Sequence, residues 1–124
     1  MAQLPVLMMS CVILDFKSTD FRLRSLAILE KKVEKSLAII DRRGKVQWRE
    51  TDRYYWKYCL SLIRYIAARW RQADKESHSS LTHLHDVGLR QAIIRSVHRT
   101  RNTILASRNY DETLREWDEL WTWS

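Results

Sequence analysis

The sequence contains few of the residues that turn a polypeptide chain. Of its 124 residues, two are glycine and one is proline. All-β and loop-rich folds need turn residues at short intervals, so this scarcity argues against both and favours long helices joined by short links. It also leaves no glycine-rich loop that could cradle a phosphate or allow close backbone approach to a cofactor.

Cysteines and long apolar runs are also scarce. Cys11 and Cys59 both lie in apolar stretches, and we interpret them as two buried thiols of an intracellular protein, cytoplasmic or nuclear. The longest apolar run, residues 4–14, is too short to span a membrane. No cation precedes it, so we favour core over a targeting signal. A strand, a buried helix and a targeting segment all remain open for this run.

Charge is abundant and unevenly distributed. The net charge is +7, yet residues 111–124 contain five acids and one arginine, which leaves +11 on residues 1–110. Most of these cations are arginine, whose guanidinium group can bind phosphate through two hydrogen bonds and stack on bases. A basic body with an acidic end indicates a polyanionic partner, or an acidic end that folds back on the body.

Apolar residues recur at helical spacing along most of the chain. With 45% hydrophobic residues, the chain can form a core and has the length of one domain, residues 1–124. We predict an all-α fold, a small bundle of four helices. One or two short strands, formed by the N-terminal apolar run and residues 45–49, are left open as an addition to the bundle. The predicted helices cover residues 19–42, 51–73, 80–107 and 111–122. Two of the predicted core stripes are Leu26, Leu29, Val33, Leu37 and Ile40, and Leu89, Ile93, Val97, Thr100 and Ile104.

Residues 51–72 show the sharpest pattern in the chain. At ~100° per residue, one face of this helix is aromatic and aliphatic, and the opposite face is a row of cations. The predicted buried face comprises Tyr55, Cys59, Leu62 and Ile66, widened by Ile63 and Trp70 on one side and by Tyr58 on the other. The predicted exposed row comprises Arg53, Lys57, Arg64 and Arg71.

A second polar face lies on the following helix and comprises Arg95, His98, Arg99 and Asn102. Two basic helical faces in one small domain are suited to binding phosphates, and Tyr54 and Tyr65 beside the first row offer rings for unpaired bases. The leading hypothesis is therefore non-enzymatic nucleic-acid binding, with RNA slightly favoured over DNA. The alternative interpretation of both rows is an ordinary water-facing charged surface.

The histidines are the remaining candidates for chemistry. His78, His83 and His85, followed by Asp86, lie close together, but no cysteine is near and their spacing matches no zinc module. We therefore predict no metal site and no cofactor. Metal binding by these histidines is the alternative that the sequence leaves open. An enzyme with a His-based site, built on His83 or His98 with a distant glutamate, is the third functional hypothesis.

The acidic C-terminal helix, residues 111–122, places Leu114, Trp117 and Trp121 on one face. Such a face can dock into an apolar groove of a partner, or it can complete the protein's own bundle, which is the interpretation we favour. The sequence Leu-Arg-Glu-Trp-Asp-Glu at 114–119 resembles the tryptophan-acidic peptides that bind kinesin light chains. The overall composition, rich in Arg, Trp and Ser, resembles that of small viral accessory proteins. These resemblances imply the second hypothesis, a small regulatory or viral-accessory-type protein–protein adaptor that uses the C-terminal Trp-acidic helix or an apolar surface. Self-association is also left open.

Overall fold

The structure is a computed structural model that describes residues 19–42, 44–73 and 80–122. Its four helices are α2 (Thr19–Asp41), α3 (Glu50–Ala73), α4 (Ser80–Leu105) and α5 (Asp111–Trp121). The described ranges contain no strand, so the predicted all-α bundle is confirmed. Every predicted helix end lies within two residues of the observed one. The apolar run 4–14 lies outside the described residues.

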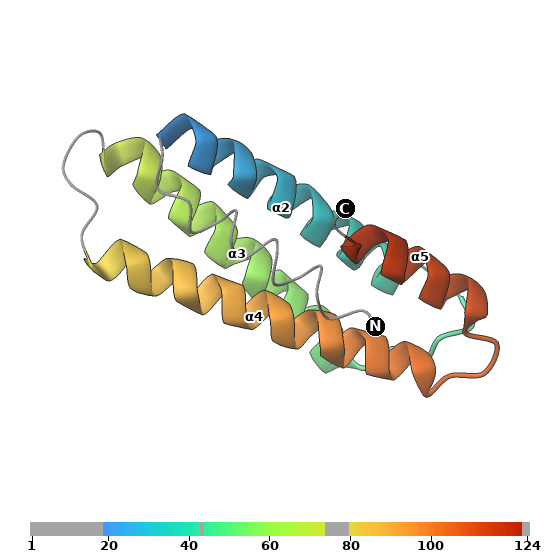
Figure 1. Cartoon of the computed structure of the whole chain (residues 1–124). Helices are drawn as coiled ribbons and strands as arrows, with labels where there is room; N and C mark the ends of the chain where they lie inside the picture. The colour runs from blue at the N-terminus through green and yellow to red at the C-terminus, as the bar shows by residue number, and fades with distance from the viewer. Residues whose placement is uncertain (1–18, 43, 74–79, 123–124) are drawn as a thin grey trace.

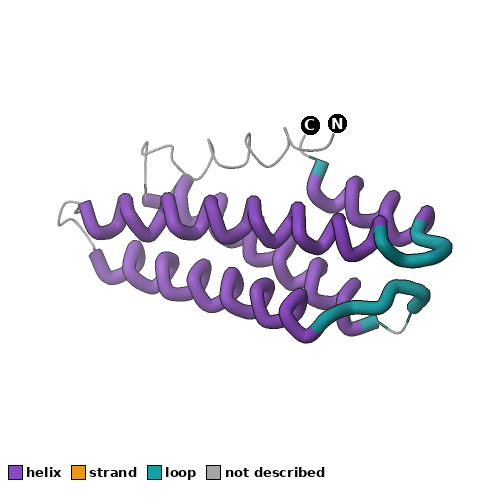
Figure 2. The backbone as a smooth tube through the Cα atoms, turned by 90° about the horizontal axis from the view of Figure 1, so that it is seen from below, coloured by secondary structure: helices purple, strands orange, loops and turns teal. Residues whose placement is uncertain are grey.

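Consecutive helices run antiparallel, and α3 lies between α2 and α4 (Figure 1). α3 packs along both of these helices, whereas the shorter α5 packs against α4 and α2. The α2–α3 and α4–α5 linkers lie at the same end of the bundle (Figure 2). Residues 45–49, for which a strand was one prediction, form an irregular linker instead, because no neighbouring described segment offers a strand to pair with. The linker is anchored by Val46, which is buried.

The predicted core stripes of α2 and α4 are confirmed. All five stripe residues of α4, from Leu89 to Ile104, are buried. Four of the five in α2 are buried, and the fifth, Leu37, is half-buried against the same core. α4 also continues without a break through Gly88.

The buried face of α3 differs from the predicted one. Cys59 and Ile66 are buried as predicted, but Tyr55 is 37% exposed, Tyr58 is 51% exposed and Leu62 is half-buried. The true buried line consists of Trp56, Cys59, Ile63, Ile66 and Trp70. At ~100° per residue, this line is turned by roughly 50° from the predicted one. An indole buries more apolar surface than a phenol, and the tyrosine hydroxyls keep contact with water when their rings lie at the rim.

Three tryptophans from α3 and α5 form the centre of the core. The Trp56 ring stacks on that of Trp121 at 5.4 Å and meets the edge of Trp117 at 5.6 Å between ring centroids. Trp56 Nε1 donates to Thr100 Oγ1 at 2.7 Å, and Trp121 Nε1 donates to Ser36 Oγ at 3.0 Å. The expectation that Trp117 is core is confirmed. Its aromatic neighbour on α3 is Trp56.

The chain enters α3 and α5 in different ways. α3 begins at Glu50, so the buried Asp52 lies inside the first turn, where its carboxylate accepts from the Arg49 amide at 2.9 Å. This is the reciprocal half of a capping box, in which a side chain at the third helical position reaches back to the cap amide. Just before α5, Asn109 adopts a left-handed turn conformation with φ of 54°. Asparagine tolerates this conformation better than most residues.

Candidate nucleic-acid interface

The basic row of α3 is exposed as predicted, but acids of α2 neutralise half of it. Arg53 donates to both carboxylate oxygens of Asp41, at 2.7 and 3.4 Å. Arg64 donates to Glu30 at 2.8 Å and to Glu34 at 3.3 Å. The hydrogen bonds to Asp41 and Glu30 raise the pKa of Arg53 and Arg64. These two arginines are therefore weaker candidates for binding phosphate than cations without acidic partners. The exposed members of the row are Arg53, Lys57, Arg64 and Arg71.

The polar face of α4 is free of such pairs. Arg95, His98, Arg99 and Asn102 are all exposed, and none of them forms an ion pair within the described part of the chain. Acids are rare around them, because the described acids of α3 and α4 are Glu50, Asp52 and Asp86, of which the last two are buried. The outer face of the α3–α4 pair is therefore cationic and little compensated by acids.

A groove of about 270 Å³ runs between α3 and α4 on this face. Its polar walls face each other: three tyrosines from two turns of α3, and two arginines from one turn of α4. The lining residues are Tyr54, Tyr55, Tyr58, Ala92, Arg95, Ser96 and Arg99. A second hollow of about 500 Å³ shares Arg95 and Arg99 and is continued by His98, Asn102 and Arg49. The two arginines thus border both hollows.

One arginine of the groove is held on a tyrosine ring. The guanidinium carbon of Arg99 lies 4.2 Å from the centroid of the Tyr55 ring, a cation–π contact. Tyr54 meets the edge of Tyr55 at 5.5 Å. Tyr54 is 66% exposed and Tyr58 is 51% exposed, and neither ring has a cation over it among the described contacts. Tyr55 therefore positions Arg99, while Tyr54 and Tyr58 present ring surface to solvent.

Tyr65, predicted to stack with bases, does not line this groove. Its ring meets the edge of the His85 ring at 5.1 Å, and the guanidinium of Arg69 lies 6.0 Å from its centroid. Tyr65 thus joins α3 to α4 at a separate point. The part of the chain that the structure describes contains no group of three or more metal-ligating side chains. The side chains of His78 and His83 lie outside it.

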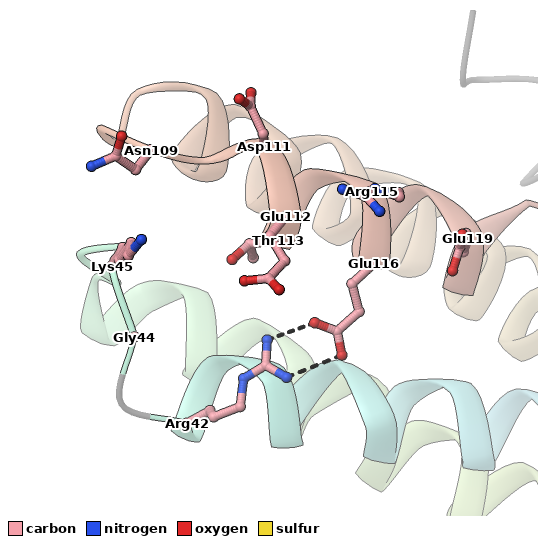
Figure 3. A pocket seen from close by; sticks show the side chains of 10 residues that line it. All are labelled: Arg42, Gly44, Lys45, Asn109, Asp111, Glu112, Thr113, Arg115, Glu116 and Glu119. Atoms are coloured by element: carbon pink, nitrogen blue, oxygen red, sulfur yellow. Dashed lines mark hydrogen bonds and ion pairs between the residues drawn. The ribbon is translucent and has the colours of Figure 1, made fainter.

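The hollow in Figure 3, about 700 Å³, lies between the end of α2 and the acidic α5. Arg42 spans it and donates to both carboxylate oxygens of Glu116, at 3.0 and 2.6 Å. This fork raises the pKa of Arg42 and lowers the pKa of Glu116. The remaining walls mix acids such as Glu112 and Glu119 with Lys45 and Arg115. Such a surface has no single sign of charge and is a poor polyanion site.

The face of α5 proposed for partner docking is turned into the core. Trp117 and Trp121 are buried, and Leu114 is half-buried against them. Arg101 holds the helix by donating to Asp118 at 2.9 and 3.0 Å. Docking through these three apolar residues would require α5 to leave the bundle, so an adaptor would have to use another apolar surface, the second option of that hypothesis.

Two contacts between buried polar side chains lie in the interior of the bundle. Arg22 and Asp86 form a buried ion pair between α2 and α4, and the Arg22 guanidinium lies 4.0 Å from the centroid of Trp70. Cys59 Sγ lies 3.6 Å from Ser96 Oγ, and burial raises the pKa of this thiol to about 11. A thiol with so high a pKa stays protonated at neutral pH and is a weak nucleophile.

Comparisons with known proteins assign no family. No family model, no curated protein and no solved structure matches the chain. Among the described helices, none combines the length and apolar content that crossing a membrane requires. The function must therefore be inferred from the surface of the bundle itself.

Proposed function

We propose that the protein binds nucleic acid without catalysing a reaction on it, with RNA favoured over DNA. The observation that carries this proposal is the α3–α4 groove, where exposed arginines without acidic partners face exposed tyrosines. Guanidinium groups bind phosphate oxygens as a fork and release condensed counterions when they do so. Sequence-independent binding of this kind needs no further machinery.

The distribution of acids supports the same surface. The acidic residues of α5 that form ion pairs, Glu116 and Asp118, are held by Arg42 and Arg101, which do not line the groove. These two α5 acids and the acids of α2 neutralise cations that lie outside the groove. Arg95 and Arg99, which line the groove, are among the arginines that form no ion pair within the described residues. RNA is favoured because protein recognition of RNA relies on unstacked bases that lie against aromatic and arginine side chains.

The test is fluorescence anisotropy of a labelled single-stranded RNA, repeated with the DNA of the same sequence, at salt concentrations from 50 to 200 mM. If about six phosphates are neutralised, the affinity should fall by about 10²- to 10³-fold across this range. Binding that does not change with salt, or no binding at the lowest salt, would reject the proposal.

A matched pair of variants locates the interface. Arg99→Gln removes one charge from the groove, and Arg115→Gln removes one charge from the exposed surface of α5. We expect Arg99→Gln to weaken RNA binding and Arg115→Gln to leave it close to wild type. Equal weakening by both variants would mean that only net charge matters, and it would contradict this assignment of the site.

A further inference from the structure

We infer that the groove between α3 and α4 receives an unpaired base, so that the ligand of this site is single-stranded nucleic acid. This inference rests on the proposed function and adds the substrate class. It assigns separate roles to the aromatic and cationic sides of the groove. Tyr54 and Tyr58 provide surfaces for the base, and Arg95 and Arg99 bind the phosphates beside it.

The arrangement of the tyrosines supports this division. One face of Tyr55 is already covered by the Arg99 guanidinium, 4.2 Å from the ring centroid, so Tyr55 orients the cation. Tyr54 and Tyr58 are one helical turn apart, which places their side chains next to each other on α3. Both are more than half exposed, at 66% and 51%. Exposed aromatic rings beside arginines are the combination on which single-stranded nucleic acids stack.

The size of the groove limits what can enter. Pockets that enclose drug-sized ligands have volumes of ~300–1,000 Å³. At about 270 Å³, the groove suits a single ring system whose neighbours along the strand stay outside. A base within a duplex is stacked on both faces and offers only its edges to a protein, so duplex nucleic acid cannot use the tyrosine surfaces.

The lining also indicates how selective the groove is. It contains no Asn, Gln, Asp or Glu side chain, and its two arginines, which could pair with a guanine edge, are assigned to the phosphates. Its one small hydroxyl, Ser96 Oγ, already contacts Cys59 Sγ at 3.6 Å. Every base has a π-face, so stacking tolerates any sequence. We therefore expect a preference for single strands with little preference for base sequence.

The test compares three probes that carry phosphate charge with and without accessible bases. These are a labelled single-stranded RNA, the same strand annealed to its complement, and inorganic polyphosphate as a base-free competitor. Tyr58→Leu should weaken binding of the single strand by about 5- to 150-fold, the range for losing one stacked base. Its affinities for the duplex and for polyphosphate should not change. Tyr58→Phe keeps the ring and should retain single-strand binding.

Tyr65→Leu is the matched control, because Tyr65 is an exposed tyrosine of the same helix that does not line the groove. It should leave binding of all three probes as in the wild type. Equal loss toward RNA and polyphosphate in Tyr58→Leu, or equal wild-type affinity for single strand and duplex, would overturn the inference while leaving nucleic-acid binding in place. Failure to bind any of the probes would reject the proposed function itself.

Discussion

The indole of Trp121 stacks on the indole of Trp56, with ring centroids 5.4 Å apart and ring planes inclined by 28°. This contact joins the last helix to the central one and, with Trp117, makes α5 part of the core. α5 is therefore a structural element of the bundle. Two of its acids, Glu116 and Asp118, pair with Arg42 and Arg101, neither of which lines the tyrosine groove.

Trp117→Ala should destabilise the bundle strongly. Trp117 is completely buried, and truncating a buried tryptophan to alanine usually costs ~3–5 kcal/mol. That is a large share of the ~5–15 kcal/mol by which a domain is stable. A thermal melt followed by circular dichroism measures the loss. Tyr54→Ala, which truncates an exposed aromatic, is the control and should melt close to wild type. If Trp117→Ala also melted like wild type, α5 would not be packed as described.

Cys59 should resist alkylation as long as the protein is folded. Burial raises the pKa of its thiol to about 11, so almost no thiolate is present at neutral pH, and solvent does not reach the sulfur. The measurement is the rate of iodoacetamide labelling in a Cys11→Ser background, where Cys59 is the single thiol, with and without denaturant. We expect slow labelling of the native protein and fast labelling of the unfolded chain. Equal rates would mean that Cys59 is not in the core.

Glu116→Gln should reduce stability at neutral pH and have little effect in acid. The hydrogen bond from Arg42 lowers the pKa of Glu116 in the folded state. The pair therefore contributes stability above the unfolded pKa, for which the reference value is 4.5, and this contribution is lost as the pH falls through the folded pKa. Both side chains are about half exposed, so the effect should be ~0–1 kcal/mol.

Denaturant melts from neutral to acidic pH measure this difference. Glu119→Gln removes an exposed carboxylate that forms no ion pair among the described residues, and it serves as the control. Its stability relative to wild type should change less with pH than that of Glu116→Gln. A constant difference between Glu116→Gln and wild type at all pH values would mean that the fork to Arg42 does not form in solution.

Helix positions could be predicted from the sequence because the pattern is local. The α4 stripe from Leu89 to Ile104 is aliphatic, with a single threonine, so the spacing alone identifies its buried face. In α3 the aromatic residues Tyr54, Tyr55 and Trp56 are consecutive, and spacing alone does not decide which of them turns inward. Packing against Trp117 and Trp121, which are distant in sequence, decides in favour of Trp56.

The candidate site was predicted in part. Arg95 and Arg99 were recognised as an exposed cationic face, and both are exposed in the structure. The pairing of Arg64 with Glu30 joins two different helices, and no spacing within one helix reveals it. The position of Tyr58 in the groove was missed because its aromatic ring was counted as core. Its polar hydroxyl was the signal that favoured the rim.

The most direct test of the proposed interface compares how the RNA affinity of two double variants depends on salt. The groove variant combines Arg95→Gln with Arg99→Gln. The α3-row variant combines Arg53→Gln with Arg64→Gln and removes the same charge from arginines that are paired with acids of α2. Log affinity falls linearly with log salt, and each lost phosphate contact makes this slope less steep by ~0.7 for single strands. We predict a slope less steep by ~1–1.5 for the groove variant and an unchanged slope for the variant of Arg53 and Arg64. Equal slopes in the two variants would contradict the assignment of nucleic-acid binding to the α3–α4 groove.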